Sequence, residues 1–243
     1  YFRNNNMSFL ILVRHGQSVW NLEKRFTGWV DVDLTKKGES EANKAGSLIK
    51  EKNIKINFYY SSLQLRANKT LKIIQNVLND KSDFVRAWQL NERHYGALTG
   101  LSKIEMSKKI GEDKVYKFRR SWDIKPEALN KKSPYHPINI TAYKDVPKEV
   151  IPDTESLKNT YERVTKYFED EIKKKLENNN VLISAHGNSI RALCKKMFGI
   201  DNNQISNLEI PTGNPLVIEL NQNSKIIRCK YLDEERAKDL IVF

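Results

Sequence analysis

The residues best suited to chemistry in this chain begin with an arginine and a histidine that directly follow an apolar run. The run Phe9–Leu12 leads into residues 13–16, Val-Arg-His-Gly. A run of this kind is typical of a buried strand, and open α/β sheets place their active sites at the carboxyl ends of their strands. We therefore predict that Arg14 and His15 lie at the edge of a sheet, where a cation and an imidazole can meet a ligand.

A second histidine repeats this arrangement far downstream. Residues 181–185, Val-Leu-Ile-Ser-Ala, form another apolar run, and His186, Gly187 and Asn188 follow it. The carboxyl ends of neighbouring parallel strands lie at one edge of a sheet. The two His-Gly pairs therefore predict two imidazoles that face each other over one pocket.

Phosphoryl transfer through a histidine is the chemistry that these residues fit. It needs a neutral imidazole with one free ring nitrogen, donors around the phosphate oxygens, and a group that moves a proton on and off the acceptor oxygen. His15 fits the first need, and Glu92 is the candidate for the last. The expected phosphate donors are Arg14, Asn21, Arg66 and His186.

Each of these residues has a simpler interpretation when it is taken alone. A histidine at a strand end commonly serves structure, and Glu92 beside Arg93 would be a surface ion pair of little energetic value. A metal site is a further alternative, although its candidate ligands show no close spacing; they are His15, Glu92, His94 and His186. We expect no metal, and we assign no role to His136. The joint placement of the other groups at strand ends favours chemistry.

Length and composition are those of a globular α/β protein. The chain has 243 residues, of which 39% are hydrophobic, enough for one large α/β domain or two small ones. No apolar stretch approaches the roughly 20 residues that span a bilayer, and no signal peptide is visible. Cys194 and Cys229 are far apart and show no metal-like spacing, which fits a reducing cytoplasm. We expect Met7 to be the natural start, with residues 1–6 outside the functional part.

A formal net charge of +12 and an isoelectric point near 9.5 raise the alternative of nucleic-acid binding. Much of the excess is lysine on predicted helix faces, as at residues 173–175, and scattered lysine is usually solvated surface. Arginine is rarer and lies near the strand ends, where a bidentate phosphate clamp would place it. The distribution favours a small anion over nucleic acid.

Strands and helices alternate along the rest of the chain. An active-site loop over residues 17–33 follows the first strand, and further strands are predicted at 58–60, 84–87, 216–220 and 226–229. Helices are predicted around residues 36–49, 63–78, 102–110, 114–121, 157–176 and 187–197. Thr35, and Ser61 or Ser62, are the expected N-caps of the first two helices. The alternation predicts a three-layer α/β/α fold, with a mostly parallel sheet covered by helices on both faces.

Residues 123–152 interrupt this alternation. Prolines stand at positions 126, 134, 137, 147 and 152, so the segment is too rich in proline for regular structure and too long for an ordinary connection. Two interpretations stay open. The segment is either an ordered excursion beside the site, able to act as a lid, or a disordered linker.

Short blocks of sequence form a further pattern along most of the chain. The first block is residues 12–21, Leu-Val-Arg-His-Gly-Gln-Ser-Val-Trp-Asn, and others lie at 26–35, 62–67, 91–103, 119–123, 184–191 and 211–213. The first block resembles the phosphohistidine signature of the cofactor-dependent phosphoglycerate mutases. Arg-His-Gly alone marks only the wider histidine phosphatase superfamily. Residues 92–96 and the pair Arg119 and Arg120 resemble the subsite that grips the glycerate carboxylate and second phosphate.

This resemblance implies one catalytic domain of the phosphoglycerate mutase type over residues 7–243, with residues 123–152 as an excursion within it. It implies interconversion of 3-phosphoglycerate and 2-phosphoglycerate in glycolysis and gluconeogenesis, with 2,3-bisphosphoglycerate priming a phosphohistidine, and a homodimer. The implied catalytic residues are Arg14, His15, Arg66, Glu92 and His186. The implied substrate-binding residues are Ser18, Asn21, Thr27, Gly28, Arg93, Tyr95, Lys103, Arg119, Arg120, Gly187 and Asn188.

Other activities stay open beside this one. Bisphosphoglycerate mutase and bisphosphoglycerate phosphatase use the same site and differ only in the relative speed of the same steps. A broad-specificity phosphatase would leave several cations of the recognition subsite without a purpose, and a basic nucleic-acid-binding protein comes last. The tail after Leu232 is short, so the covering of the active site by the tail, which this family can show, is left open.

Overall fold

A six-stranded sheet forms the middle of the fold in the computed structural model, which describes residues 7–237. The strand order is β3-β2-β4-β1-β5-β6. The first four of these strands pair in parallel, whereas β5 runs antiparallel to β1 and β6 runs antiparallel to β5. The expected mostly parallel sheet is therefore confirmed. The bounds are β1 Ser8–Arg14, β2 Phe58–Ser61, β3 Val85–Arg86, β4 Val181–Ala185, β5 Leu216–Leu220 and β6 Ile226–Tyr231.

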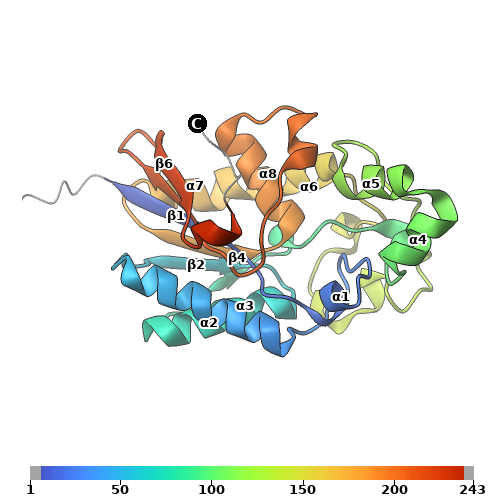
Figure 1. The fold of residues 1–243 in the computed structure, drawn as a ribbon, viewed down its shortest axis with the longest axis horizontal. Helices are drawn as coiled ribbons and strands as arrows, with labels where there is room; N and C mark the ends of the chain where they lie inside the picture. Colours follow the sequence, from blue (N-terminus) through green and yellow to red (C-terminus); the bar gives the residue numbers. More distant parts are fainter. Residues whose placement is uncertain (1–6, 238–243) are drawn as a thin grey trace, which may run out of the picture.

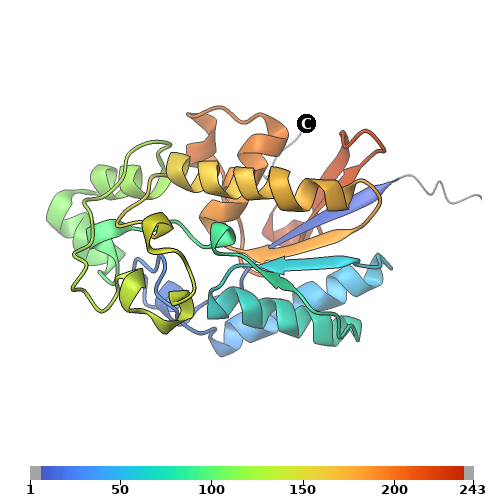
Figure 2. The ribbon, with the colours of Figure 1, turned by 180° about the vertical axis from the view of Figure 1, so that it is seen from behind.

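Helices cover both faces of this sheet (Figure 1). One face carries α2, Lys36–Glu51, and α3, Leu65–Leu78. The other face carries a long helical rod that crosses the molecule (Figure 2), together with α8. The rod is one helix in the prediction, whereas the structure inserts a π-helical turn between its two α-helical parts. The bounds on this face are α6 Leu157–Tyr167, the π turn Phe168–Ile172, α7 Lys173–Leu176 and α8 Gly187–Phe198.

The central strand β1 anchors both layers of helices. Leu10 and Leu12 belong to the core cluster that includes residues of α6 and α8, whereas Ile11 and Val13 belong to the cluster that includes residues of α2 and α3. Successive side chains on a strand point to opposite faces of the sheet. A single apolar run thus fixes the position of the residues that follow it, Arg14 and His15.

The less regular part of the chain gathers at the carboxyl ends of β1, β2 and β4 (Figure 1). The loop after β1 contains a short helix, α1, Val19–Leu22. Two further helices at this end, α4 over Lys103–Ile110 and α5 over Glu112–Arg120, match the predicted helical stretches closely. These three helices and the strand ends together surround the site described below.

The proline-rich segment 123–152 is an ordered excursion, so the alternative of a disordered linker is wrong. It contains three short 3₁₀ helices, Pro137–Asn139, Thr141–Tyr143 and Lys148–Val150. The Tyr143 hydroxyl donates a hydrogen bond to the carbonyl of Trp29, and both side chains are buried together in one apolar cluster. The segment therefore packs against the active-site loop.

The predicted helix caps are right for α2 and wrong for α3. Thr35 Oγ1 accepts a hydrogen bond from the N–H of Gly38, at 3.1 Å, as an N-cap does. Neither Ser61 nor Ser62 caps α3, which begins after Gln64. The Ser61 hydroxyl donates instead to the carbonyl of Ser184, at 3.0 Å, because β2 and β4 are neighbours in the sheet. The Ser62 hydroxyl contacts a histidine of the site.

Two expectations about the ends of the chain lie outside the described residues. The first is the role of residues 1–6 before Met7. The second is the covering of the site by the C-terminal tail, insofar as it concerns residues 238–243.

Candidate active site

His15 stands one residue beyond β1, and its backbone N–H donates to the carbonyl of Ala185 at 3.0 Å. Its Nδ1 lies 2.7 Å from the carbonyl oxygen of Gly16. A carbonyl can only accept, so Nδ1 carries the ring proton and Nε2 keeps its lone pair. The Nε–H of Arg66 donates to the lone pair of this Nε2 at 3.3 Å. The ring is thus oriented for Nε2 to act as a nucleophile.

The charge state of His15 also suits a nucleophile. Burial holds the pKa of His15 well below its usual value of 6.5, and the positive charges of Arg66 and Arg14 lower it further. Only 2% of the residue is exposed. The imidazole is therefore neutral at physiological pH, which is the form that attacks phosphorus.

His186 faces His15, as the paired strand ends predict. The centroids of the two rings are 5.0 Å apart, with the planes tilted by 59°. Nε2 of His186 lies 2.7 Å from the hydroxyl of Ser62, while its buried Nδ1 has no partner among the described residues. Burial lowers the pKa of His186, and the charge of Arg66 adds to this. A buried ring nitrogen without a partner is available to an oxygen of a ligand.

The active-site loop fixes the position of the Arg66 guanidinium. It lies in the first turn of α3, and its two terminal nitrogens donate to the carbonyls of Gly28 and Val30, both at 2.9 Å. Gly28 has a φ of 54°, in the left-handed region that favours glycine. This turn directs the Gly28 carbonyl to the guanidinium. Each terminal nitrogen of Arg66 keeps a second N–H for a ligand.

Gly16 allows a close approach beside the nucleophile. A Cβ on Gly16 would lie 2.1 Å from the carbonyl oxygen of Gly38, in the first turn of α2. No side chain fits at that distance. The glycine of the Arg-His-Gly motif therefore lets the loop after β1 pass directly over α2.

Glu92 is a carboxylate that lines the same cavity as His15, and main-chain donors fix its orientation. Its Oε1 accepts from the N–H of Arg93 at 2.7 Å and from the N–H of Asn188, at the start of α8, at 3.2 Å. Its own N–H donates to Oε1 of Gln64 at 2.9 Å. Only 9% of the residue is exposed. The carboxylate is held still, with its remaining exposure in the cavity that it lines.

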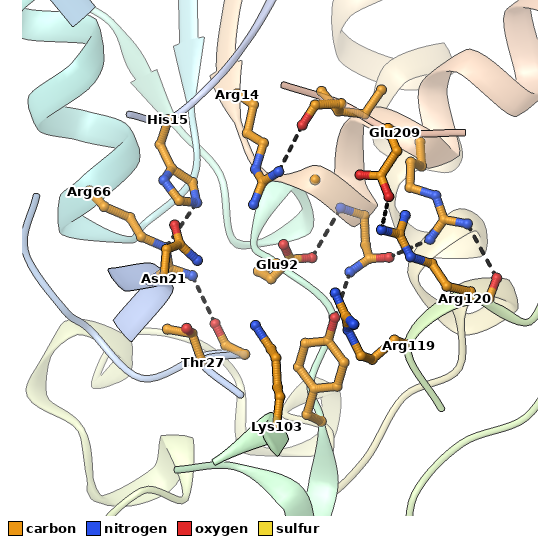
Figure 3. Close-up of a pocket in the computed structure, with 16 residues that line it drawn as sticks. Arg14, His15, Asn21, Thr27, Arg66, Glu92, Lys103, Arg119, Arg120 and Glu209 are labelled. Atoms are coloured by element: carbon orange, nitrogen blue, oxygen red, sulfur yellow. Dashed lines mark hydrogen bonds and ion pairs between the residues drawn. The ribbon is translucent and has the colours of Figure 1, made fainter. Parts of the chain in front are cut away.

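These groups line one cavity of about 140 Å³, drawn in Figure 3. Six cationic side chains line it against two acidic ones, an excess of positive charge that suits a polyanionic ligand. All but three of the predicted site residues line this cavity; the exceptions are Ser18, Arg93 and His186. The lining consists of Arg14, His15, Asn21, Thr27, Gly28, Arg66, Glu92, Tyr95, Lys103, Arg119, Arg120, Gly187, Asn188, Arg191, Glu209 and Ile210.

The three predicted residues outside the lining lie directly behind it. His186 packs against His15, as described above. Ser18 is the N-cap of α1, and its hydroxyl accepts from the N–H of Asn21 at 3.3 Å. Arg93 is fully buried and lies 4.7 Å from the centre of the Tyr95 ring. From these positions, the three residues can hold the lining residues His15, Asn21 and Tyr95 in place.

Sequence reasoning missed three lining residues: Arg191, Glu209 and Ile210. Arg191 has a usable signal, because it stands one helical turn after Asn188 and donates to its Oδ1 at 2.9 Å. Glu209 forms an ion pair with Arg120 at one side of the cavity (Figure 3). The carbonyl of Ile210 accepts from Arg14 at 2.7 Å. Nothing in the local sequence marks these last two contacts, which depend on the loop before β5.

Burial in the cavity wall, together with neighbouring positive charges, lowers the pKa of two of the cations. Burial lowers the pKa of Lys103. Burial, together with the charges of Arg120 and Arg93, lowers the pKa of Arg191 to about 9. The Nε atoms of Arg14 and Arg191 are buried without a partner among the described residues. Such a set of donors gains most from a ligand that brings several negative charges.

Comparison with known proteins agrees with this geometry. Residues 10–136 and 132–232 match the Histidine phosphatase superfamily (branch 1). The 2,3-bisphosphoglycerate-dependent phosphoglycerate mutase of Pelagibacter ubique is 67% identical over 98% of this chain and 100% of its own length. This chain belongs to that mutase family. The enzyme of the same name from Borreliella burgdorferi is 48% identical over 93% of this chain and 92% of its own.

The solved structure of Bacillus stearothermophilus YhfR shares the fold alone, since only 20% of its residues are identical. Its TM-score is 0.68, over 90% of this chain and 94% of that one. The histidine phosphatase fold is thus common to the mutase family and to more distant proteins. A shared fold does not identify the residues that recognise a substrate, so those of this chain are inferred from its own cavity.

The described residues contain no group of three or more His, Cys, Asp or Glu side chains placed to hold a metal ion. Within residues 7–237, no helix is long and apolar enough to cross a membrane.

Proposed function

We propose that this chain interconverts 3-phosphoglycerate and 2-phosphoglycerate through phosphorylation of His15 at Nε2. The observation that carries this proposal is the oriented, neutral imidazole of His15 in a cavity of cations. Membership of the mutase family assigns the activity as a whole. The roles of the individual residues are our inference from the geometry.

The cavity fits 2,3-bisphosphoglycerate, which supplies the phosphoryl group that primes the enzyme. Two features support this fit: the excess of cations in the lining and the buried Nε of Arg14, a donor that lacks a partner among the described residues. A ligand with two phosphates and a carboxylate would satisfy both. Removing such donors from solvent is costly unless a ligand restores their hydrogen bonds.

The transferring phosphoryl group would be held by donors on both sides of His15. Arg66 presents its remaining N–H groups from one side and Arg14 presents its Nε from the other, with Asn21 and His186 beside them. The backbone N–H of Gly187, at the start of α8, adds the positive end of a helix. These donors would act most strongly as charge builds up on the oxygens in the transition state.

The proton that each transfer moves would pass through Glu92. When His15 attacks phosphorus, the N–P bond forms, the P–O bond breaks, and the departing oxygen needs a proton. The reverse step removes that proton from the attacking hydroxyl. Glu92 is positioned for both directions, because backbone donors fix one of its oxygens and it lies in the same cavity as His15.

The far side of the cavity would hold the rest of the substrate. Lys103, Arg119 and Arg120 reach into it from α4 and α5, opposite His15 (Figure 3). Their charges suit the carboxylate and the second phosphate of the bisphosphate. Between the two half-reactions, that second phosphate must take the place of the first one beside His15. Both orientations of the substrate then find cations at each end.

The test of the proposed function is an assay of 2-phosphoglycerate formation coupled to enolase, run with and without added 2,3-bisphosphoglycerate. We expect strong stimulation by the bisphosphate, and full activity after the mutase has been treated with EDTA and the chelator removed before coupling. Rates of bisphosphoglycerate synthesis and hydrolysis are measured on the same preparation. Hydrolysis or synthesis faster than mutase turnover would overturn the proposal in favour of a sister activity.

Arg66 and Arg120 are expected to contribute to different kinetic constants. Arg66→Lys keeps the charge but loses the planar fork, so kcat should fall by about 10²-fold, as for a lost transition-state donor. Arg120→Lys should mainly raise KM, because Arg120 holds a remote group equally well before and during transfer. Arg86→Lys, at an exposed position of β3, is the control. Changes in KM alone for both variants would contradict this division.

Two finer points accompany the proposal. We propose a homodimer, tested by the mass of the protein in solution, and a cytoplasmic location. The thiols of Cys194 and Cys229 are both free in the structure, and Cys194 is buried, which agrees with a reducing compartment.

A further inference from the structure

Arg163, on α6, is a buried arginine that does not line the cavity. Its side chain is only 9% exposed, yet every nitrogen of its guanidinium is engaged. Nε and Nη2 donate to the two carboxylate oxygens of Glu155, at 2.7 and 2.9 Å. Nη1 donates to the carbonyls of Gln89 and Asn91, at 2.6 and 2.9 Å, and Nη2 also donates to the carbonyl of Glu92 at 2.9 Å. One side chain thus holds three carbonyls of a single loop.

Glu155 extends this hold to the other side of Glu92. Its Oε2 accepts from the N–H of His94 at 2.8 Å, and its own N–H donates to the carbonyl of His94 at 3.0 Å. Together, Arg163 and Glu155 bind the main chain of the loop at positions 89, 91, 92 and 94. The carboxylate thought to move the proton lies between these attachment points.

The loop conformation decides where the Glu92 carboxylate points. One of the two donors to its Oε1 is the N–H of Arg93, which belongs to the same loop. If the loop shifted, that donor would move with it. The carboxylate would then no longer point toward the substrate oxygen whose proton it moves. Displacement by about 1 Å can cost a reaction on the order of 10²-fold.

A buried ion pair is weak support for stability alone, since apolar residues often replace one at no loss. Here the pair also makes hydrogen bonds to the main chain of one loop, at positions 89, 91, 92 and 94, and that loop carries the acid–base candidate. We propose that Arg163 and Glu155 are positioning residues for Glu92 in the phosphoryl-transfer step. This inference rests on the proposed role of Glu92 as the proton shuttle.

The test uses Arg163→Lys, Glu155→Gln and Glu92→Gln, each alone, and Arg163→Lys combined with Glu92→Gln. Arg163→Lys keeps the charge, but an ammonium cannot span a carboxylate and three carbonyls. The measurements are kcat and KM for 3-phosphoglycerate, and the single-turnover rate of His15 phosphorylation by 2,3-bisphosphoglycerate. Inhibition by inorganic phosphate reports whether the phosphoryl pocket is intact. Arg228→Lys and Glu162→Gln, at exposed positions, are matched controls.

We expect Arg163→Lys to lower kcat and the phosphorylation rate by about tenfold to a hundredfold, with KM and inhibition by phosphate changed less than twofold. When Glu92 is already glutamine, the same substitution should lower the rate less than twofold, because its effect passes through the missing carboxylate. Glu155→Gln should follow the same pattern, and it decides the matter if Arg163→Lys does not fold.

Three results would contradict the proposals, and they distinguish failure of the positioning role from failure of the Glu92 shuttle. A normal kcat in Arg163→Lys and Glu155→Gln overturns the positioning role. An equal loss from Arg163→Lys with and without the Glu92 carboxylate also overturns it, since the effect would then be structural. A near-normal kcat in Glu92→Gln alone overturns the proposed shuttle itself, and this is read from a variant in which Arg163 and Glu155 are intact.

Discussion

Replacing His15 by asparagine is expected to abolish mutase turnover, by at least about 10⁴-fold, as loss of a covalent nucleophile does. An asparagine amide can keep the hydrogen bond to the Gly16 carbonyl that Nδ1 makes, so the loop is preserved while Nε2 is lost. With labelled 2,3-bisphosphoglycerate, the unaltered chain should carry an acid-labile, base-stable phosphoryl group, and His15→Asn should carry none.

A second histidine variant serves as the control for this labelling. The ring of His136 contacts Asp153 at 2.9 Å and lines no part of the cavity. His136→Asn should therefore take up label normally. Label retained by His15→Asn at the level of the control would show that another residue is the phosphate acceptor.

The lowered pKa of His15 adds a pH dependence to this expectation. Protonation removes the lone pair that attacks phosphorus, but the pKa of His15 in the folded chain lies well below 6.5. Phosphoryl uptake should thus not decline between pH 8 and 6.5 because of His15. Below pH 6.5 the unfolded chain binds this proton more readily than the folded one, so the free energy of unfolding should decrease as pH falls.

The positions of strands β1 and β4, and of the functional residues that follow them, were predictable because short-range sequence patterns determine them. An apolar run followed by Arg14 and His15 needs only the alternation of a strand to position both residues. His186 follows β4 in the same way, and β1 and β4 are neighbours in the sheet. The facing imidazoles are therefore a direct consequence of two local signals and one parallel pairing.

The remaining features depend on contacts between distant segments. Ser62 has the right type and place for a helix cap, but the neighbouring β4 brings His186 within 2.7 Å of its hydroxyl. Glu209 meets Arg120 only because the loop before β5 folds over α5. Arg163 looks like an ordinary polar position of an amphipathic helix until the loop at Glu92 packs against it. No propensity or spacing rule contains these partners.

Glu92→Gln is expected to lower kcat by about 10²–10⁴-fold, the range typical of lost acid–base catalysis. The amide has the shape of the carboxylate, and its oxygen can still accept from the N–H groups of Arg93 and Asn188. Binding should therefore survive, with KM little changed. Priming of His15 by 2,3-bisphosphoglycerate should slow as well, because the departing oxygen then lacks a proton donor. Steady-state rates and single-turnover labelling measure the two effects.

Glu162→Gln, an exposed position of α6, controls for the change of charge. If Glu92→Gln turned over at a near-normal rate, the proton would have to move through another group. His186 would be the next candidate, because its ring lies 5.0 Å from that of His15 and its Nδ1 is buried without a partner among the described residues. The low pKa of His186 would then predict a rate that changes with pH only well below 6.5.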